Sequence, residues 1–203
     1  MDTKYWDNKY KNQETPWDIG YASPAIIQYL TEINVDNKSI LIPGAGNAYE
    51  AKWLLQHTIA NVTVVDISPT VIEKLKIETN TYANRIKCEL GNFFDHEGTY
   101  DLIIEQTFFC AIHPTMRHNY AKKMTKLLAK QGILCGLLFN TFFEKEGPPF
   151  GGEIKAYKKL FSKYFYDVSI EPTDLSIPPR RGREVFIKIS NPVINSNDNF
   201  IFK

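Results

Sequence analysis

Short apolar runs alternate along this chain with segments that have the periodicity of an amphipathic helix. The sequence predicts strands at residues 39–42, 62–65, 86–90, 100–104, 133–139, 164–170 and 184–189. It predicts helices at residues 24–34, 49–57, from 69, from 114 to a stop at Gly132, and at 154–162. This alternation is typical of strands that are connected through helices, so an α/β sheet is expected. The last two strands can pair as an antiparallel edge.

The composition limits the number of domains and the kind of partner. The 203 residues contain no internal repeat and no low-complexity linker, so residues 1–203 are predicted to form one domain. Lysine and arginine number 24 against 23 acidic residues, and the net charge is +1. No broad basic surface is expected to attract nucleic acid or anionic lipid, which makes a small molecule the expected partner. Because no exposed apolar helix is evident, a monomer is expected.

The cysteines and the apolar segments predict a cytoplasmic protein without a membrane span. Cys88, Cys110 and Cys135 lie in apolar stretches, at spacings that fit neither a zinc site nor a disulfide framework. We interpret them as reduced, buried thiols. Residues 1–12 lack the apolar core of a secretory signal, and residues 132–143 are too few to cross a bilayer.

The first predicted strand leads directly into a glycine-containing turn, Gly44-Ala45-Gly46-Asn47-Ala48, and a helix follows. Asp66 ends the second predicted strand. Glycines let the backbone approach a ligand closely, and a carboxylate after the second strand can accept hydrogen bonds from a ribose diol. A glycine turn alone fits an ordinary tight turn equally well. The strand, turn, helix and carboxylate together predict a site for a nucleoside cofactor.

The residue at the start of the next helix separates two classes of cofactor. NAD enzymes have a third glycine there, and the pyrophosphate lies on the N-terminus of the helix. This chain has the bulky Tyr49 at that position, which disfavours a dinucleotide. S-adenosylmethionine has no phosphate groups and requires less of the helix end. Asp66 is compatible with both cofactors.

Polar and aromatic residues follow the third and fourth predicted strands. Gly91-Asn92-Phe93-Phe94-Asp95 can place an amide at the edge of adenine and a ring on its face, or can form an ordinary turn. Residues 105–110 follow the fourth strand, at the edge where open α/β sheets bind ligands.

Both ends of the chain have unusual compositions. Residues 1–23 concentrate aromatic side chains, among them Tyr5 and those of the TPWDIG segment, in a charged region. Their π faces can cap a sulfonium cation, or the segment can be an arm packed across the sheet. Residues 191–203 are polar and asparagine-rich, so they are expected to form a loose tail, apart from Phe200, Ile201 and Phe202.

These segments, in this order, resemble the thiopurine S-methyltransferase family, which includes halide, thiol and thiocyanate methyltransferases. The similar segments are TPWDIG, LIPGAGNAYEA, VVDIS, GNFFD, TFFCAIHPTMR and the GPPF loop, within a resemblance that extends from Tyr5 to Ile189. The resemblance implies a Rossmann-like class I methyltransferase fold with a mostly parallel seven-stranded sheet, an antiparallel last strand and helices on both faces. It also implies methyl transfer from S-adenosylmethionine to a small thiol or related soft nucleophile.

The resemblance further implies which residues contact the cofactor. Trp6, Tyr10 and Trp17 would close over the cofactor. Gly44 would lie beside its amino-acid part, and Asp66 would hold the ribose. Asn92 and Phe93 would bracket adenine. The candidate contacts are Trp6, Tyr10, Trp17, Gly44, Gly46, Asp66, Ile67, Asn92, Phe93 and Gln106.

Some positions depart from the family pattern. Members usually have tryptophan in place of Tyr10 and aspartate in place of Asn92. Gln106 and Phe139 replace tyrosines of plant relatives. These departures leave the acceptor open among thiopurine, thiocyanate, sulfide, other thiols and halides.

Methyl transfer from a sulfonium is an in-line displacement, which depends on holding the reacting atoms collinear. A thiol with a pKa near 8.5 is partly ionised at neutral pH, so a general base is optional. His113 can be such a base or can cap the helix that begins at Pro114. Candidate walls of an acceptor pocket, each of which can instead belong to the core, are Phe108, Phe109, Phe139, Phe142, Phe143 and Phe150.

Several alternatives stay open. Residues 180–183 can bind an anion, although a solvated turn is favoured, and Cys110 lacks a matched histidine that would make it a nucleophile. No metal site is predicted. The competing functions are an NAD-dependent oxidoreductase, a non-catalytic S-adenosylmethionine-binding protein and a nucleic-acid methyltransferase. The near-zero net charge opposes the last, as does the position of Pro148-Pro149, which follow the fifth predicted strand and not the fourth.

Overall fold

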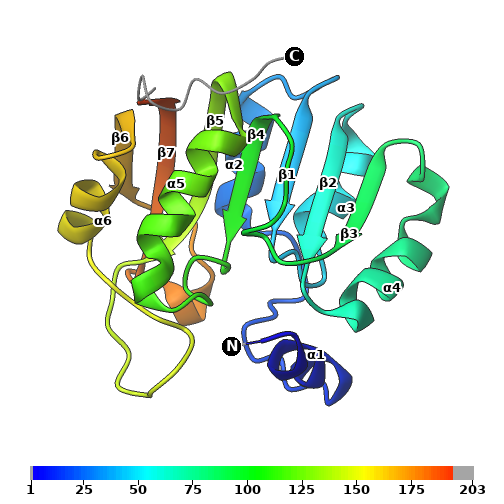
Figure 1. The fold of residues 1–203 in the computed structure, drawn as a ribbon, viewed down its shortest axis with the longest axis horizontal. Coiled ribbons are helices and arrows are strands. Elements are labelled where there is room, and N and C mark those ends of the chain that lie inside the picture. Colours follow the sequence, from blue (N-terminus) through cyan, green and yellow to red (C-terminus); the bar gives the residue numbers. More distant parts are fainter. Residues whose placement is uncertain (1, 194–203) are drawn as a thin grey trace.

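The computed structural model describes residues 2–193, and within this range seven strands form one sheet in the order β3-β2-β1-β4-β5-β7-β6. The neighbours from β3 to β5 pair in parallel, whereas β7 is antiparallel to both β5 and β6. The predicted sheet, mostly parallel with an antiparallel last strand, is confirmed (Figure 1). The strands are β1 (Ser39–Pro43), β2 (Asn61–Asp66), β3 (Ile86–Leu90), β4 (Tyr100–Gln106), β5 (Leu128–Phe139), β6 (Phe165–Pro172) and β7 (Glu184–Pro192).

Helices cover both faces of the sheet, as predicted. Side chains alternate along β1, so that Ile40 and Ile42 pack with α2, α3 and α4 while Leu41 packs with α5 and α6 on the other face. No helix within residues 2–193 is long and apolar enough to span a membrane. The helices are α1 (Thr3–Lys11), α2 (Pro24–Glu32), α3 (Tyr49–His57), α4 (Pro69–Glu78), α5 (Arg117–Leu127) and α6 (Ile154–Phe161), with short 3-10 helices η1 (Asn80–Tyr82), η2 (Pro114–Met116) and η3 (Pro178–Arg180).

The predicted end of the helix at Gly132 is wrong. α5 ends at Leu127, and Gly132 lies inside β5, where a Cβ atom would come within 2.7 Å of the Tyr100 carbonyl oxygen. The pairing passes from Tyr100–Leu128 to Leu102–Ile133, so β5 bulges at this point. A glycine after an amphipathic run therefore marks a close approach between strands here and not the end of a helix.

The predicted loose tail is wrong in its first residues. β7 includes Asn191 and Pro192, and Pro192 pairs with Phe165 of β6. The rest of that prediction, including Phe200, Ile201 and Phe202, lies outside the described residues.

The N-terminal helix α1 lies below the carboxyl ends of β1, β2 and β4 in Figure 1. Asp7 on this helix is 5% exposed, and its carboxylate accepts hydrogen bonds from Ser68 Oγ at 2.7 Å and from Thr70 N at 3.0 Å, at the start of α4. Lys11 pairs with the same carboxylate at 2.7 Å. Burial raises the pKa of Asp7, but the hydrogen bonds from Lys11, Ser68 and Thr70 prevail and hold that pKa well below its usual range. A buried, ionised group thus fastens α1 to α4.

Replacing Asp7 by alanine is expected to loosen α1. Charge-assisted hydrogen bonds contribute about 1.5 to 3 kcal/mol, so the amides of residues 3–11 should exchange with solvent at least about tenfold faster. Glu14→Ala is the matched control, because it removes an exposed ion pair with Lys9 of the same helix, leaves the contacts of Asp7 with α4 in place, and should leave this exchange unchanged. Equal exchange in the Asp7→Ala variant and the wild type would contradict the anchoring role.

The loss of stability caused by Asp7→Ala should depend on pH. The pKa of Asp7 is lowered from 3.8, so its contribution to stability is present above that pH and is lost as the pH falls below it. The difference in unfolding free energy between wild type and Asp7→Ala should therefore narrow on acidification below about pH 4.

Candidate functional site

A cavity of about 660 Å³ lies between α1 and the carboxyl ends of the parallel strands, where open α/β sheets bind ligands. Its walls come from α1 and the following loop, the turn after β1, the end of β2, and the loops after β3, β4 and β5. The structure brings almost all of the predicted site residues together around it. Those that line the cavity are Trp6, Tyr10, Trp17, Gly44, Gly46, Asp66, Ile67, Asn92, Phe93, Gln106, Phe108, His113, Phe139 and Phe150.

Three phenylalanines predicted as candidates for the acceptor pocket lie elsewhere. Phe109 is 1% exposed and packs in the core, with its ring 5.0 Å from that of Tyr120. Phe142 is 73% exposed, and Phe143 packs edge-on against Phe139. These placements correct the prediction: a turn after the strand sends neighbouring aromatics in opposite directions, which a local pattern does not reveal.

The glycine turn after β1 needs its glycines for both conformation and space. Gly44 and Gly46 have φ angles of +58° and +52°, in the left-handed region that favours glycine. A Cβ at Gly44 would overlap the Phe108 ring, and a Cβ at Gly46 would lie 2.7 Å from the Tyr10 hydroxyl. The turn therefore lets two aromatic side chains of the cavity approach its backbone closely.

Asp66, at the end of β2, joins two loops. Its Oδ2 accepts a hydrogen bond from Gly46 N at 3.0 Å, and its Oδ1 accepts one from Ser68 N at 2.9 Å. The side chain is 6% exposed, and burial raises its pKa against the opposing hydrogen bonds. Each carboxylate oxygen keeps a further lone pair, so Asp66 can accept additional hydrogen bonds from a ligand in the cavity.

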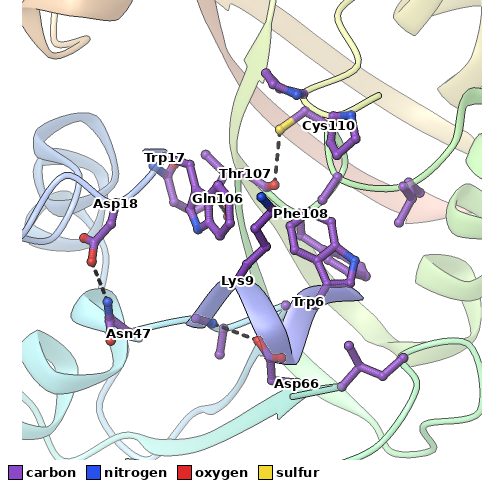
Figure 2. A pocket seen from close by; sticks show the side chains of 18 of the residues that line it. Trp6, Lys9, Trp17, Asp18, Asn47, Asp66, Gln106, Thr107, Phe108 and Cys110 are labelled. Carbon is purple, nitrogen blue, oxygen red and sulfur yellow. Dashed lines mark hydrogen bonds between the residues drawn. The ribbon is translucent and has the colours of Figure 1, made fainter. Parts of the chain in front are cut away.

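The predicted aromatic cap forms one cluster over the cavity. The Trp17 ring lies edge-on to Trp6 at 5.5 Å and to Tyr10 at 6.0 Å. Figure 2 shows Trp6 and Trp17 at the cavity together with Phe108. The π faces of these rings can stabilise a cation. The alternative reading of this segment as a packing arm also describes part of what it does, because Asp7 docks α1 against α4.

Three hydrogen bonds that the sequence did not predict hold the loop around Trp17. Asp18 accepts hydrogen bonds from the Asn47 side chain, drawn as a dashed line in Figure 2, and from the Tyr49 hydroxyl. Tyr49, which disfavoured a dinucleotide, thus has a structural partner. Arg180 donates a hydrogen bond from Nη2 to the Trp17 carbonyl at 2.7 Å.

Arg180 corrects the prediction of a solvated arginine turn. It is 9% exposed, lies over the Phe139 ring and lines the cavity, whereas Arg181 and Arg183 are exposed. It also pairs with the buried Glu184, four residues further along the chain, at 3.4 Å. Its contact with Trp17, 163 residues away, could not be found from a local pattern.

The loop after β3 combines a turn with a wall of the cavity. The Asn92 Oδ1 accepts a hydrogen bond from Phe94 N at 3.0 Å, which is the ordinary turn left open as the alternative. Phe93 is 3% exposed, and its ring lies 5.1 Å from that of Phe108. Both residues also line the cavity.

Gln106, the last residue of β4, has an unusual environment. Its Oε1 is buried and has no hydrogen-bond partner within residues 2–193. A buried acceptor without a partner is costly and needs an explanation. Its place in the wall of the cavity suggests that the side chain takes its partner from a ligand.

The two candidate groups for proton transfer or nucleophilic attack differ in exposure. His113 is exposed and caps η2, with Nδ1 2.8 Å from Thr115 Oγ1, as the helix-cap alternative predicts. Cys110 is buried, and burial raises the pKa of its thiol to about 12. Its Sγ donates to the Thr107 carbonyl. Within the described part of the chain, no group of three or more His, Cys, Asp or Glu side chains could hold a metal ion.

Comparison with known proteins identifies the family. The family model described as thiopurine S-methyltransferase (TPMT) matches residues 1–193. The chain is 32% identical to a probable thiol methyltransferase 2 of Arabidopsis thaliana over 184 residues, which cover 88% of this chain and 81% of that protein. It is 29% identical to thiocyanate methyltransferase 1 of the same organism over 187 residues, with the same coverage.

A solved structure shows the same fold. It is that of the 1,6-didemethyltoxoflavin-N1-methyltransferase of Burkholderia thailandensis with bound 1,6-didemethyltoxoflavin and S-adenosylhomocysteine. Its TM-score is 0.69 at 16% identity, over 95% of this chain and 87% of that one. The fold, the cavity and the family match agree. The chain belongs to the thiopurine S-methyltransferase family of S-adenosylmethionine-dependent methyltransferases.

Proposed function

We propose that this chain transfers a methyl group from S-adenosylmethionine to a small sulfur nucleophile or related soft acceptor in the cavity between α1 and the sheet. The observation that carries the proposal is that one cavity has two kinds of wall. One wall consists of the glycine turn, Asp66 and the aromatic cluster. The other is apolar and includes Phe108, Phe139 and Phe150. A donor and an acceptor can therefore meet inside a single enclosed space.

The residues present fit the cofactor. Asp66 has lone pairs left for ribose hydroxyls, and Trp6, Tyr10 and Trp17 present rings that favour a cation. The unpaired Gln106 Oε1 is a further sign of a missing polar partner. The other proposed contacts are Gly44, Gly46, Ile67, Asn92 and Phe93, all of which line the cavity.

The chemistry requires little more than positioning. When bound, S-adenosylmethionine supplies an electrophilic methyl group on a positively charged sulfur. Trp6 and Trp17 stabilise that charge, and the apolar wall excludes water from the acceptor. Phe108, which belongs to the apolar wall and packs against Gly44 of the glycine turn, can keep the acceptor in line with the methyl group.

No general base is assigned in this proposal. His113 already acts as a helix cap, and a small thiol is partly ionised at neutral pH. Cys110 stays protonated because burial raises its pKa to about 12, so the chain's own thiol does not compete with the acceptor.

The names of the relatives favour an acceptor that attacks through sulfur. Thiols, hydrogen sulfide, thiocyanate and thiopurines are the proposed acceptors, and halides are a related possibility. A single domain, a monomeric state and a cytoplasmic location stay predictions. The free state of Cys88, Cys110 and Cys135 supports the last.

The cofactor assignment predicts selective binding. Titration calorimetry should detect S-adenosylhomocysteine with a dissociation constant on the order of micromolar and should detect no binding of NAD. Asp66→Asn should weaken the binding of S-adenosylhomocysteine at least about tenfold, because a carboxylate accepts stronger hydrogen bonds than an amide. Asp101→Asn is the control, since Asp101 accepts from Ser39 N at the opposite end of the sheet. Binding of NAD alone would support the oxidoreductase instead.

The acceptor assignment predicts turnover with labelled S-adenosylmethionine against a panel of thiols, hydrogen sulfide, thiocyanate, halides and a thiopurine. At least one sulfur acceptor should be methylated. Phe150→Ala should raise the KM for that acceptor about tenfold, whereas Phe142→Ala, at an exposed site of the same loop region, should not. Cofactor binding without turnover across the whole panel would indicate a non-catalytic binding protein.

A further inference from the structure

A buried carboxylate outside the proposed contacts organises the loop after β4. Glu105 is 0% exposed, and its Oε1 accepts hydrogen bonds from both Phe108 N and Phe109 N at 2.8 Å. Its Oε2 accepts one from the Tyr120 hydroxyl of α5 at 2.6 Å. Within residues 2–193 these three groups are its hydrogen-bond donors, and no lysine, arginine or histidine forms an ion pair with it.

The loop that Glu105 holds is strained. Thr107 has a φ angle of +60°, and a β-branched residue in the left-handed region is a genuine outlier. Such a conformation persists only where surrounding contacts impose it. The two amide hydrogen bonds to Glu105 span this residue, and Cys110 Sγ donates to the Thr107 carbonyl.

The turn at Thr107 directs the side chains of Phe108 and Phe109 to different parts of the structure. Phe109 enters the core, whereas Phe108 packs so closely on the glycine turn that a Cβ at Gly44 would overlap its ring. Phe108 also contacts Phe93, with 5.1 Å between the ring centroids. Figure 2 shows Phe108 and Thr107 in the wall of the cavity, beside Trp6. The position of the Phe108 ring therefore depends on the hydrogen bonds to Glu105.

Keeping a carboxylate here costs stability. Burial raises the pKa of Glu105 to about 7, while the hydrogen bonds from Tyr120, Phe109 and Phe108 lower it. The titratable groups that face it are Tyr120 from α5 and Cys110 from its own loop, and burial raises the pKa of both. A neutral side chain would be cheaper to bury at this position.

We propose that Glu105 is a positioning residue for methyl transfer, whose ionised carboxylate fixes Phe108 against Gly44 and so sets the boundary between the donor and acceptor parts of the cavity. This inference rests on the proposed function.

The test compares wild type with Glu105→Gln. Glutamine keeps an oxygen for the two amides but carries no charge, so it resembles the protonated carboxyl. At pH 8 the variant should bind S-adenosylhomocysteine about tenfold more weakly than wild type, since neutral acceptors form weaker hydrogen bonds. Between pH 8 and pH 6 the affinity of wild type should fall towards that of the variant, while the variant's affinity stays nearly constant.

Stability should change in the opposite direction. Because burial raises the pKa of Glu105 from 4.5 to about 7, the folded protein binds this proton more tightly than the unfolded chain does. The stability contributed by Glu105 therefore falls as the pH rises through that range. At pH 8, Glu105→Gln should melt at the same temperature as wild type or above it. A purely structural carboxylate predicts lower stability together with weaker binding.

Two further variants test whether Glu105 affects cofactor affinity by positioning Phe108. In a Phe108→Leu background, Glu105→Gln should have no additional effect on affinity, whereas additive effects would overturn the proposal. Tyr120→Phe keeps both amide hydrogen bonds but removes one that lowers the pKa of Glu105. It should move the midpoint of the pH profile upwards, and an unmoved midpoint would also count against the proposal.

The outcomes separate this inference from the proposed function. If wild type binds S-adenosylhomocysteine and Glu105→Gln binds it equally well at every pH, only the role of Glu105 is refuted. If wild type does not bind it at all, both proposals fall.

Discussion

The site depends on the fully buried Ser68, which lies between two carboxylates. Its backbone amide donates to Asp66, and its hydroxyl donates to Asp7 while accepting from Val71 N. Asp66 also accepts from Gly46 N. One hydrogen-bonded cluster therefore joins α1, the glycine turn, β2 and α4. Loss of any of these hydrogen bonds would therefore affect the positions of both the glycine turn and α1, which lie on two sides of the cavity.

Carboxylates recur at this edge of the sheet as acceptors for backbone amides. Glu50 accepts from Ser23 N before α2, Asp66 from the glycine turn and Glu105 from the loop after β4. Burial raises the pKa of all three, so each costs stability at neutral pH. Such groups are tolerated where loop geometry matters more than stability, which is typical of functional sites.

How much the sequence predicts depends on how local the governing contact is. The role of Asp66 follows from a strand, a turn and a helix within one short unit, and the pattern reveals it. Asp7 and Arg180 each have an ion-pair partner four residues away, but the contacts that place them at the site are with Ser68 and Trp17, 61 and 163 residues away, which no local pattern reveals. Phe108 lines the cavity and Phe109 packs in the core because the chain turns at Thr107. Threonine does not favour the left-handed conformation that Thr107 adopts, so the sequence does not predict this turn. The alternating strands and helices gave the sheet correctly because periodicity is a local property as well.

A crystal structure with bound S-adenosylhomocysteine would show whether this cavity holds the cofactor. We expect the ligand to lie between α1 and the glycine turn. Its ribose hydroxyls should be within hydrogen-bonding distance of Asp66, and its sulfur should face the cluster of Trp6, Tyr10 and Trp17. A ligand bound elsewhere, or bound in this cavity without contact to Asp66, would contradict it.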